Sequence, residues 1–456
     1  MNLLRDFKLS ENKNISIFCF LFFISSYICL TNCLIEIPFT AIEVKNIPKY
    51  KDIEVKEPLD FSKLDKSNIT MFYTDGSIVI NKNFLFLAHI TIGSNNQPFN
   101  LLLDTGSHVL WVAEENCKET SKIPITNHYA PSKSTTKKTT TQSFEITYGT
   151  GSVQGFYYYD YAKYINNKQF WIKFGAAKKA DFAVYNCDGI IGLSHDYSSN
   201  NEISFIHMLK KANIIDSTKF SFKFIGENSG KLILGEHDDF SKSNAVTAPL
   251  ITLKGEANLF WVCEVSGFGL VNTNEQIKSL KSYNIIFDTG TNFILLPIQY
   301  YYDMKEKLKD FGCTTTYKEK DIQLVCSNYN TLPDFIFIIN GHTLTLSKYY
   351  SIYLSNDSKY YSSILFVKEE RYIIGSPFFV AFHTLFDKEN EQLHFYPEEN
   401  STIDKDSYTS SVVALIVIII LLILFLGFLI YRWILWRRAK RELNDIPSSN
   451  YNYNNF

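Results

Sequence analysis

The stretch Leu101–Val112, LLLDTGSHVLWV, decides the fold of this chain, because a similar stretch, Ile285–Leu296, IIFDTGTNFILL, occurs later. In each stretch three apolar residues lead into Asp-Thr-Gly and a hydroxyl residue, and a second apolar run follows. An apolar run that ends at an acid and a glycine predicts a strand with a carboxylate at its end, where burial can change its acidity. Two such carboxylates, Asp104 and Asp288, indicate acid/base chemistry.

A second motif, Ile-Ile-Gly, follows each acid at nearly the same spacing. Gly192 lies 88 residues after Asp104, and Gly375 lies 87 residues after Asp288. A common spacing in two separate parts of a chain is typical of an internal repeat. The sequence therefore predicts two related lobes, each of which contributes one acid.

Short apolar or alternating runs dominate the chain from Ile78 onward, and clusters of Gly, Asn, Ser and Lys separate them. This pattern predicts an all-β fold. Helical periodicity is only local, for instance at Glu202–Ala212 and Pro297–Phe311. We therefore expect two β lobes with a cleft between them.

Two apolar segments indicate the compartment. Ile15–Leu30 follows a basic start, as in a signal peptide or a signal anchor. Val412–Ile430 is a run of nineteen uncharged residues, close to the ~20 needed to span a bilayer. Because Arg437 and Arg438 follow it, the positive-inside rule predicts a single-pass type I protein with a cytosolic tail. We expect the rest of the chain to lie in the lumen of the secretory pathway or outside the cell.

Composition and motifs exclude several other kinds of protein. The chain has 45 Lys and Arg residues against 47 Asp and Glu residues, so no basic excess favours a nucleic-acid partner. The nine His and eight Cys residues show no zinc-ligand spacing, and there is no GxSxG elbow. We expect no metal and no cofactor.

The cysteines allow one disulfide to be predicted. Cys313 and Cys326 bracket a short polar segment, TTTYKEKDIQLV, and are the expected bridge in an oxidising compartment. No pairing is evident for the four other cysteines beyond the first apolar segment, Cys33, Cys117, Cys187 and Cys263.

Two aspartates that meet between two lobes would share a proton, since like charges at close range cannot both ionise cheaply. One carboxylate would accept a proton from water while its protonated partner donates a hydrogen bond to a carbonyl. Such a pair hydrolyses an amide bond without a metal or a covalent intermediate.

The neighbouring residues fit this chemistry. Gly106 and Gly290 are expected to let the chain bend tightly beside the acids. The hydroxyl groups of Ser107 and Thr291 are expected to donate hydrogen bonds to the carboxylates. We expect a second pair of hydroxyl residues to tie the two loops together, namely Thr105 and Thr289.

DTGSHVLWV and FDTGTNFILLP resemble the two active-site loops of pepsin-like aspartic proteases, and the resemblance extends from about Ile78 to Pro397. It implies the bilobal pepsin-like fold with Asp104 and Asp288 as the catalytic pair. The segment YGTGSVQGF is similar to the flap hairpin that closes over substrate in that family. The resemblance implies flap roles for Tyr148, Gly149 and Thr150, and a contact between the Tyr148 hydroxyl and Trp111. It also supports the Cys313–Cys326 bridge.

The sequence thus predicts a membrane-anchored aspartic endopeptidase that acts as a monomer on extended peptides or proteins at mildly acidic pH. Its membrane segment and its Lys- and Asn-rich composition look most like the plasmepsin-type enzymes of apicomplexan parasites. One alternative is a membrane-tethered peptide-binding protein with an inactive form of the fold, but both Asp-Thr-Gly motifs are intact. Another is a one-motif protease of the retroviral type that must dimerise, but two motifs lie in one chain.

The expected order of segments is 1–33 signal peptide or signal anchor, 34–74 pro-segment, 75–247 N-terminal β lobe with the flap, 248–400 C-terminal β lobe, 401–411 linker, 412–431 transmembrane helix and 432–456 cytosolic tail. Three sequons predict a glycoprotein, at Asn68, Asn356 and Asn400.

Overall fold

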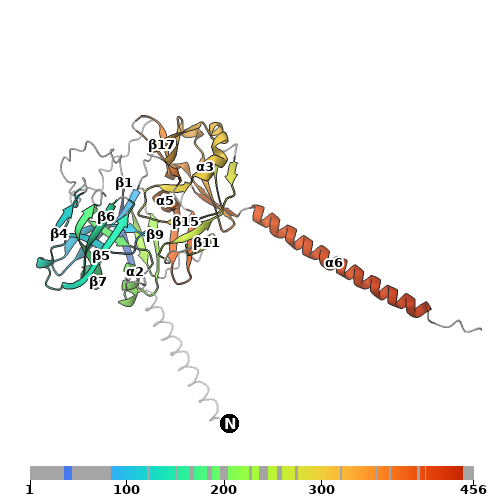
Figure 1. Ribbon diagram of the computed structural model, residues 1–456, viewed down its shortest axis with the longest axis horizontal. Coiled ribbons are helices and arrows are strands. Elements are labelled where there is room, and N and C mark those ends of the chain that lie inside the picture. The colour runs from blue at the N-terminus through green and yellow to red at the C-terminus, as the bar shows by residue number, and fades with distance from the viewer. Residues whose placement is uncertain are drawn as a thin grey trace, which may run out of the picture. The chain divides into compact units, whose positions relative to one another are not determined.

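The computed structural model of this 456-residue chain is mostly β (Figure 1). It describes residues 35–43, 84–120, 124–149, 151–163, 169–181, 187–195, 204–224, 229–235, 245–253, 259–272, 276–318, 321–355, 357–368, 371–397, 401–405 and 407–444. The three sequon asparagines and the predicted signal segment 1–33 lie outside these residues.

The largest sheet has thirteen strands among the described residues and includes segments from both halves of the chain. Its strands, in spatial order, are β11 (Val246–Pro249), β25 (Gln392–Pro397), β24 (Phe382–Asp387), β9 (Lys219–Phe224), β10 (Ser229–Leu234), β1 (Ile35–Glu43), β2 (Phe84–Ile92), β3 (Gln97–Asp104), β8 (Gly189–Gly192), β4 (Trp111–Glu119), β7 (Gln169–Asp181), β6 (Gly151–Lys163) and β5 (Lys138–Tyr148).

Two further sheets in the part of the chain that the structure describes come from its second half. One contains, in order, β12 (Val262–Val265), β15 (Tyr283–Phe287), β23 (Ile373–Ile374), β16 (Ile294–Pro297), β22 (Tyr360–Val367), β18 (Asp321–Cys326) and β17 (Cys313–Lys318), with β21 (Ile352–Leu354) paired to β22. The other contains β14 (Gln276–Ser279), β13 (Gly267–Val271), β19 (Asp334–Ile339), β20 (His342–Leu346) and β26 (Thr402–Lys405).

The sequence repeat appears as a repeated strand arrangement. In the first half, β8 pairs in parallel with β3 and antiparallel with β4. In the second half, β23 pairs in parallel with β15 and antiparallel with β16. Each Ile-Ile-Gly strand therefore lies between the two strands that flank an Asp-Thr-Gly loop. This confirms the prediction of a bilobal all-β fold.

The helices in the described part of the chain are short apart from the last one. They are α2 (Phe205–Lys211), α3 (Ile298–Met304), α4 (Lys348–Ser351), α5 (Ser376–Ala381) and α6 (Ser407–Asn444), with 3-10 turns η2 (Pro131–Lys133), η6 (Lys305–Phe311) and η7 (Tyr329–Thr331).

Both helical predictions hold, with changed details. The first helix begins later than expected because the Ser204 hydroxyl accepts a hydrogen bond from the His207 N–H and caps α2. The second is α-helical only to Met304 and continues as a 3-10 helix, which Gly312 ends with a positive φ of 64°.

The segment predicted as a pro-segment contains a described strand. β1 lies between β2 and β10 and pairs antiparallel with both. Residues 44–83 lie outside the described part of the chain, so the extent of the pro-segment remains a prediction. The lobe boundary predicted after residue 247 falls within β11, which pairs with β25 from the end of the second lobe.

The C-terminal part, Lys405–Phe456, forms a unit separate from Met1–Asp404. Helix α6 is longer than the predicted span at both ends, and β26 and the start of α6 occupy residues predicted as a linker. Its segment Ile419–Arg438 is long and apolar enough to cross a membrane, and none of this segment is buried within the protein. One such helix is weak evidence for membrane association.

The predicted disulfide is present. Cys313 and Cys326 are cross-strand partners of β17 and β18 and form a bridge. Among the described cysteines, Cys117, Cys187 and Cys263 are free thiols.

Candidate active site

Both acids lie at the ends of buried strands. Asp104 is the last residue of β3, and its carbonyl oxygen accepts a hydrogen bond from the Leu193 N–H at 2.7 Å. Asp288 follows β15, and its N–H donates to the Ile374 carbonyl oxygen at 2.9 Å. Only 4% of the Asp104 surface and 9% of the Asp288 surface are exposed. Strand pairing therefore fixes the backbone of both acids.

Two threonines join the loops across the interface between the lobes. The Thr105 hydroxyl donates to the Phe287 carbonyl oxygen at 2.9 Å and accepts from the Thr289 N–H at 2.9 Å. Reciprocally, the Thr289 hydroxyl donates to the Leu103 carbonyl oxygen at 2.8 Å and accepts from the Thr105 N–H at 3.1 Å. Both threonines are fully buried, so these four bonds tie the loops together without competition from water.

The glycines after the acids lie at turns, as predicted, and close packing requires them as well. The chain turns at Thr105–Gly106 and at Thr289–Gly290, and neither glycine is among the described glycines with positive φ. A Cβ atom on Gly106 would lie 2.6 Å from Cγ of Asp288, and one on Gly290 would lie 2.4 Å from Oδ1 of Asp104. Each glycine makes room for the carboxylate of the other lobe, which brings the two acids together.

Each carboxylate accepts two hydrogen bonds from its own loop. Asp104 accepts from the Gly106 N–H at 2.8 Å and from the Ser107 hydroxyl at 2.5 Å. Asp288 accepts from the Gly290 N–H at 2.8 Å and from the Thr291 hydroxyl at 2.6 Å. The two sets are equivalent, so each carboxyl group has a fixed orientation.

The environment of Asp104 favours its protonated form. Burial raises the pKa of Asp104 well above the usual value of 3.8, and the adjacent Asp288 raises it further through its charge and a hydrogen bond. The hydrogen bonds from Ser107 and Gly106 act in the opposite direction but are smaller influences than burial. A carboxyl group that keeps its proton can donate a hydrogen bond in this site.

The predicted flap is an antiparallel hairpin of β5 and β6, in which Tyr148 is opposite Gly151. The Tyr148 hydroxyl accepts a hydrogen bond from Nε1 of the buried Trp111 at 2.9 Å. Burial and, next, the charge of Asp104 raise the pKa of Tyr148, so its hydroxyl is neutral and lies near the acids. Gly149 is exposed at the turn, and Thr150 lies outside the described residues.

Two glycines that were recognised only as part of a repeat also shape the site. A Cβ atom on Gly192 would lie 2.4 Å from the His108 carbonyl carbon, and one on Gly375 would lie 2.3 Å from the Thr291 carbonyl oxygen. The Ile-Ile-Gly strands therefore pack directly against the loops that follow the acids. The nearly equal spacing of these motifs from the two acids was the signal in the sequence.

A buried carboxylate next to the first Ile-Ile-Gly strand has a supporting position as well. Asp188 is fully buried and accepts hydrogen bonds from the N–H groups of Asn100 and Asn127, both at 2.8 Å. It therefore joins β3 to the segment before η2. No group of three or more His, Cys, Asp and Glu side chains suited to a metal ion occurs in the described part of the chain.

The chain is similar to known proteins over the part that contains this site. The family model for eukaryotic aspartyl proteases matches residues 85–397. Gastricsin from Oryctolagus cuniculus is 29% identical over 68% of this chain and 80% of its own length. Pepsin A from Sus scrofa is 25% identical over 82% of this chain and 98% of its own length. Vacuolar protease A from Arthroderma otae is 29% identical over 60% of this chain and 68% of its own. The chain belongs to the eukaryotic aspartyl protease family.

Proposed function

We propose that this chain is an active aspartic endopeptidase with Asp104 and Asp288 as its catalytic residues. The observation that carries the proposal is the reciprocal packing of each carboxylate against the glycine of the other loop. This packing, with the raised pKa of Asp104, supports a proton-sharing pair.

In the proposed reaction the carboxylate of Asp288 accepts a proton from a water molecule as that water attacks the peptide carbonyl carbon. The protonated Asp104 donates a hydrogen bond to the carbonyl oxygen, where negative charge develops. Asp288 then passes the proton it accepted to the amide nitrogen, so the carbon–nitrogen bond breaks, the amine leaves and the attacked carbon becomes a carboxylic acid. Ser107 and Thr291 hold the carboxyl groups in orientation through the hydrogen bonds they donate.

The proposed substrate is an extended peptide or a protein segment that binds beneath the flap. Extended peptides bind to β structure by backbone hydrogen bonds, and alternate side chains enter pockets. Tyr148, Gly149 and Thr150 are the proposed flap residues, and the bond between Trp111 and the Tyr148 hydroxyl supports this role. Because both Asp-Thr-Gly loops lie in one chain, we propose a monomer.

We further propose a type I membrane protein of the secretory pathway or cell surface, with α6 as its anchor and the lobes in the lumen or outside the cell. The apolar segment Ile419–Arg438 supports this proposal. The predicted leader, removable pro-segment, glycosylation and kinship with plasmepsin-type enzymes rest on the sequence alone.

Three variants of the full chain would test the proposed activity. After removal of the pro-segment, the wild type should cleave a peptide library between about pH 4 and 7, where a shared proton is retained. Asp104→Asn and Asp288→Asn should each lose cleavage, because each removes one ionisable member of the pair. Asp310→Asn is the matched control, since its side chain is 44% exposed on the surface, and it should cleave like the wild type.

The inactive peptide-binding alternative predicts a different outcome. An inactive protein would bind peptides without cleaving them, and all four proteins would give the same uncleaved library. Equal cleavage by the wild type and both dyad variants would indicate a contaminating protease and would reject the assigned residues.

A further inference from the structure

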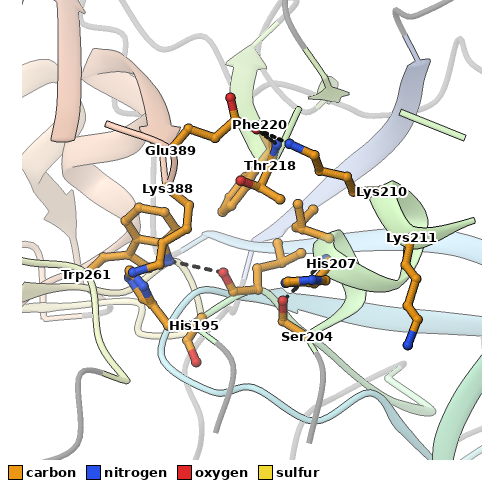
Figure 2. Close-up of a pocket in the computed structure, with 13 residues that line it drawn as sticks. His195, Ser204, His207, Lys210, Lys211, Thr218, Phe220, Trp261, Lys388 and Glu389 are labelled. Carbon is orange, nitrogen blue, oxygen red and sulfur yellow. Dashed lines mark hydrogen bonds and ion pairs between the residues drawn. The ribbon is translucent and has the colours of Figure 1, made fainter. Parts of the chain in front are cut away.

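A cavity of about 620 Å³ lies where α2, β9 and the turn between β24 and β25 meet the segment after β8 (Figure 2). This volume is within the range of pockets that bind small organic ligands, about 300–1,000 Å³. The proposed reaction does not use this cavity, because neither acid and no flap residue lines it.

The floor of the cavity contains polar atoms that lack partners. Ser194 and His195 are each only 3% exposed. The Ser194 hydroxyl oxygen and both ring nitrogens of His195 have no hydrogen-bond partner in the described structure. Burial, and then the nearby charge of Lys388, lower the pKa of His195 to about 3, so the ring is neutral and keeps one N–H donor. Buried polar groups without partners are uncommon, and they indicate a missing ligand or water.

The walls are apolar and aromatic. Leu193, Ile206, Phe220 and Trp261 line the cavity. Trp261 lies with its ring centre 4.2 Å from that of His195 and 5.6 Å from that of Phe220. Between 0 and 4% of the surface of each of these four residues is exposed, so they form closely packed apolar walls next to the polar floor.

The charges around the cavity are mainly positive. Figure 2 shows the Lys388 side chain reaching toward the His195 ring. Lys388 also lies 3.6 Å from Glu391, but such exposed pairs are weak and exchange readily. The carboxylate of Glu389 is already bound to Lys210 and to the Thr218 N–H. Lys388 is therefore the cation best placed to meet a ligand that reaches the floor.

The cavity wall is joined to both acid loops through the backbone. The Ser194 N–H donates to the Ser107 carbonyl oxygen at 2.9 Å, on the first loop. The Trp261 carbonyl oxygen accepts from the Phe287 N–H at 2.8 Å, directly before Asp288. The cavity is thus a separate site that shares supporting residues with the acids.

We propose that this cavity is a second ligand site, which binds a small organic anion with an apolar body. The anionic group contacts Lys388, the His195 N–H and the Ser194 hydroxyl, and the apolar body packs on Trp261 and Phe220. A cation would meet repulsion from Lys388. The proposal holds whether or not the chain is an active protease.

The test is calorimetric titration of the full-length protein in detergent with octanoate, which carries a carboxylate on an apolar chain. Octanamide, with the same chain and no charge, and acetate, with the charge and almost no chain, are the comparison ligands. We expect octanoate to bind at least about tenfold more tightly than octanamide, because hydrogen bonds to charged groups are roughly twice as strong as neutral ones. We expect the same margin over acetate, because acetate has almost no apolar chain to bury. Titration into detergent without protein corrects for partition into micelles.

Variants locate the binding. Lys388→Gln keeps the length of the side chain and should weaken octanoate binding about tenfold by removing the charge. Lys211→Gln is the matched control, because Lys211 lines the same cavity but points away from His195 (Figure 2), and its affinity should stay within about twofold of the wild type. His195→Phe fills the space of the ring without its N–H and should also weaken binding. Nitrogen-15 NMR of the His195 ring should show a shift when octanoate is added.

Three results would overturn the proposal. They are equal affinity for octanoate and octanamide, unchanged octanoate binding in Lys388→Gln, and absence of both heat and the His195 shift at millimolar octanoate. Thermal unfolding of each variant verifies that it is folded, so a loss of affinity reports on the cavity.

Discussion

Replacing Gly106 by Ala should disable the acid pair with little harm to the rest of the protein. The added Cβ atom would lie 2.6 Å from Cγ of Asp288 and 2.7 and 2.8 Å from its two oxygens. Ordinary contact begins at 3.4 Å, so the carboxylate must move by 0.8 Å, which is 3.4 minus 2.6. A misplacement of about 1 Å in a catalytic group can lower the rate about 100-fold. We expect kcat/KM to fall by about this factor.

The assay is peptide hydrolysis by purified Gly106→Ala and by Gly427→Ala, together with thermal unfolding. Gly427 is the matched control because it lies in α6 and nothing lies within 4 Å of its added Cβ atom, so kcat/KM should remain within about threefold of the wild type. Overpacking at Gly106 should cost only about 1–3 kcal/mol of unfolding free energy. If Gly106→Ala hydrolysed peptide as fast as Gly427→Ala, the cross-packing would not position the acid, and the reasoning would fail.

Two further predictions concern the stability of the site. Thr105→Val should lower the free energy of unfolding in urea by about 2–4 kcal/mol, since it leaves the Phe287 carbonyl and the Thr289 N–H buried without a partner, whereas Thr105→Ser should lose much less. The second concerns pH: because burial and Asp288 raise the pKa of Asp104, the folded protein retains this proton to higher pH than the unfolded chain. The associated stability is present below the unfolded pKa near 3.8 and is lost as pH rises through the folded pKa, so Asp104→Asn should flatten the pH dependence in that window. A steeper or unchanged profile would contradict the assigned direction.

Much of the fold could be predicted from periodicity and repetition. Short apolar runs predicted buried strands in both lobes, and β3 and β15 are two of these strands. The spacing of the Ile-Ile-Gly motifs indicated two related halves, and β8 and β23 occupy equivalent places in them. The strand order could not be predicted, because β1 and β24 enter the same large sheet from opposite ends of the chain. Such pairing depends on long-range contacts that leave no local pattern.

The site shows the same limit at the level of single residues. Residue types allowed the hydroxyl groups of Ser107 and Thr291 to be predicted as donors to the acids. The turns at Gly106 and Gly290 were also predicted, but their second role was not, because the carboxylate that excludes a side chain there belongs to the other lobe. The cavity around His195 left no signal in the sequence, because its residues come from five separate segments.

The geometry of the acids depends on both lobes at once. The four hydrogen bonds of Thr105 and Thr289 join residues 182 to 186 positions apart, and each glycine contacts the carboxylate of the other loop. Each loop orients its own carboxyl group, but bringing the two carboxyl groups together requires both lobes. Because these contacts need residues from both lobes, the acid pair is complete only when both lobes are folded and docked. The proposed sharing of a proton between Asp104 and Asp288 therefore depends on the joined lobes.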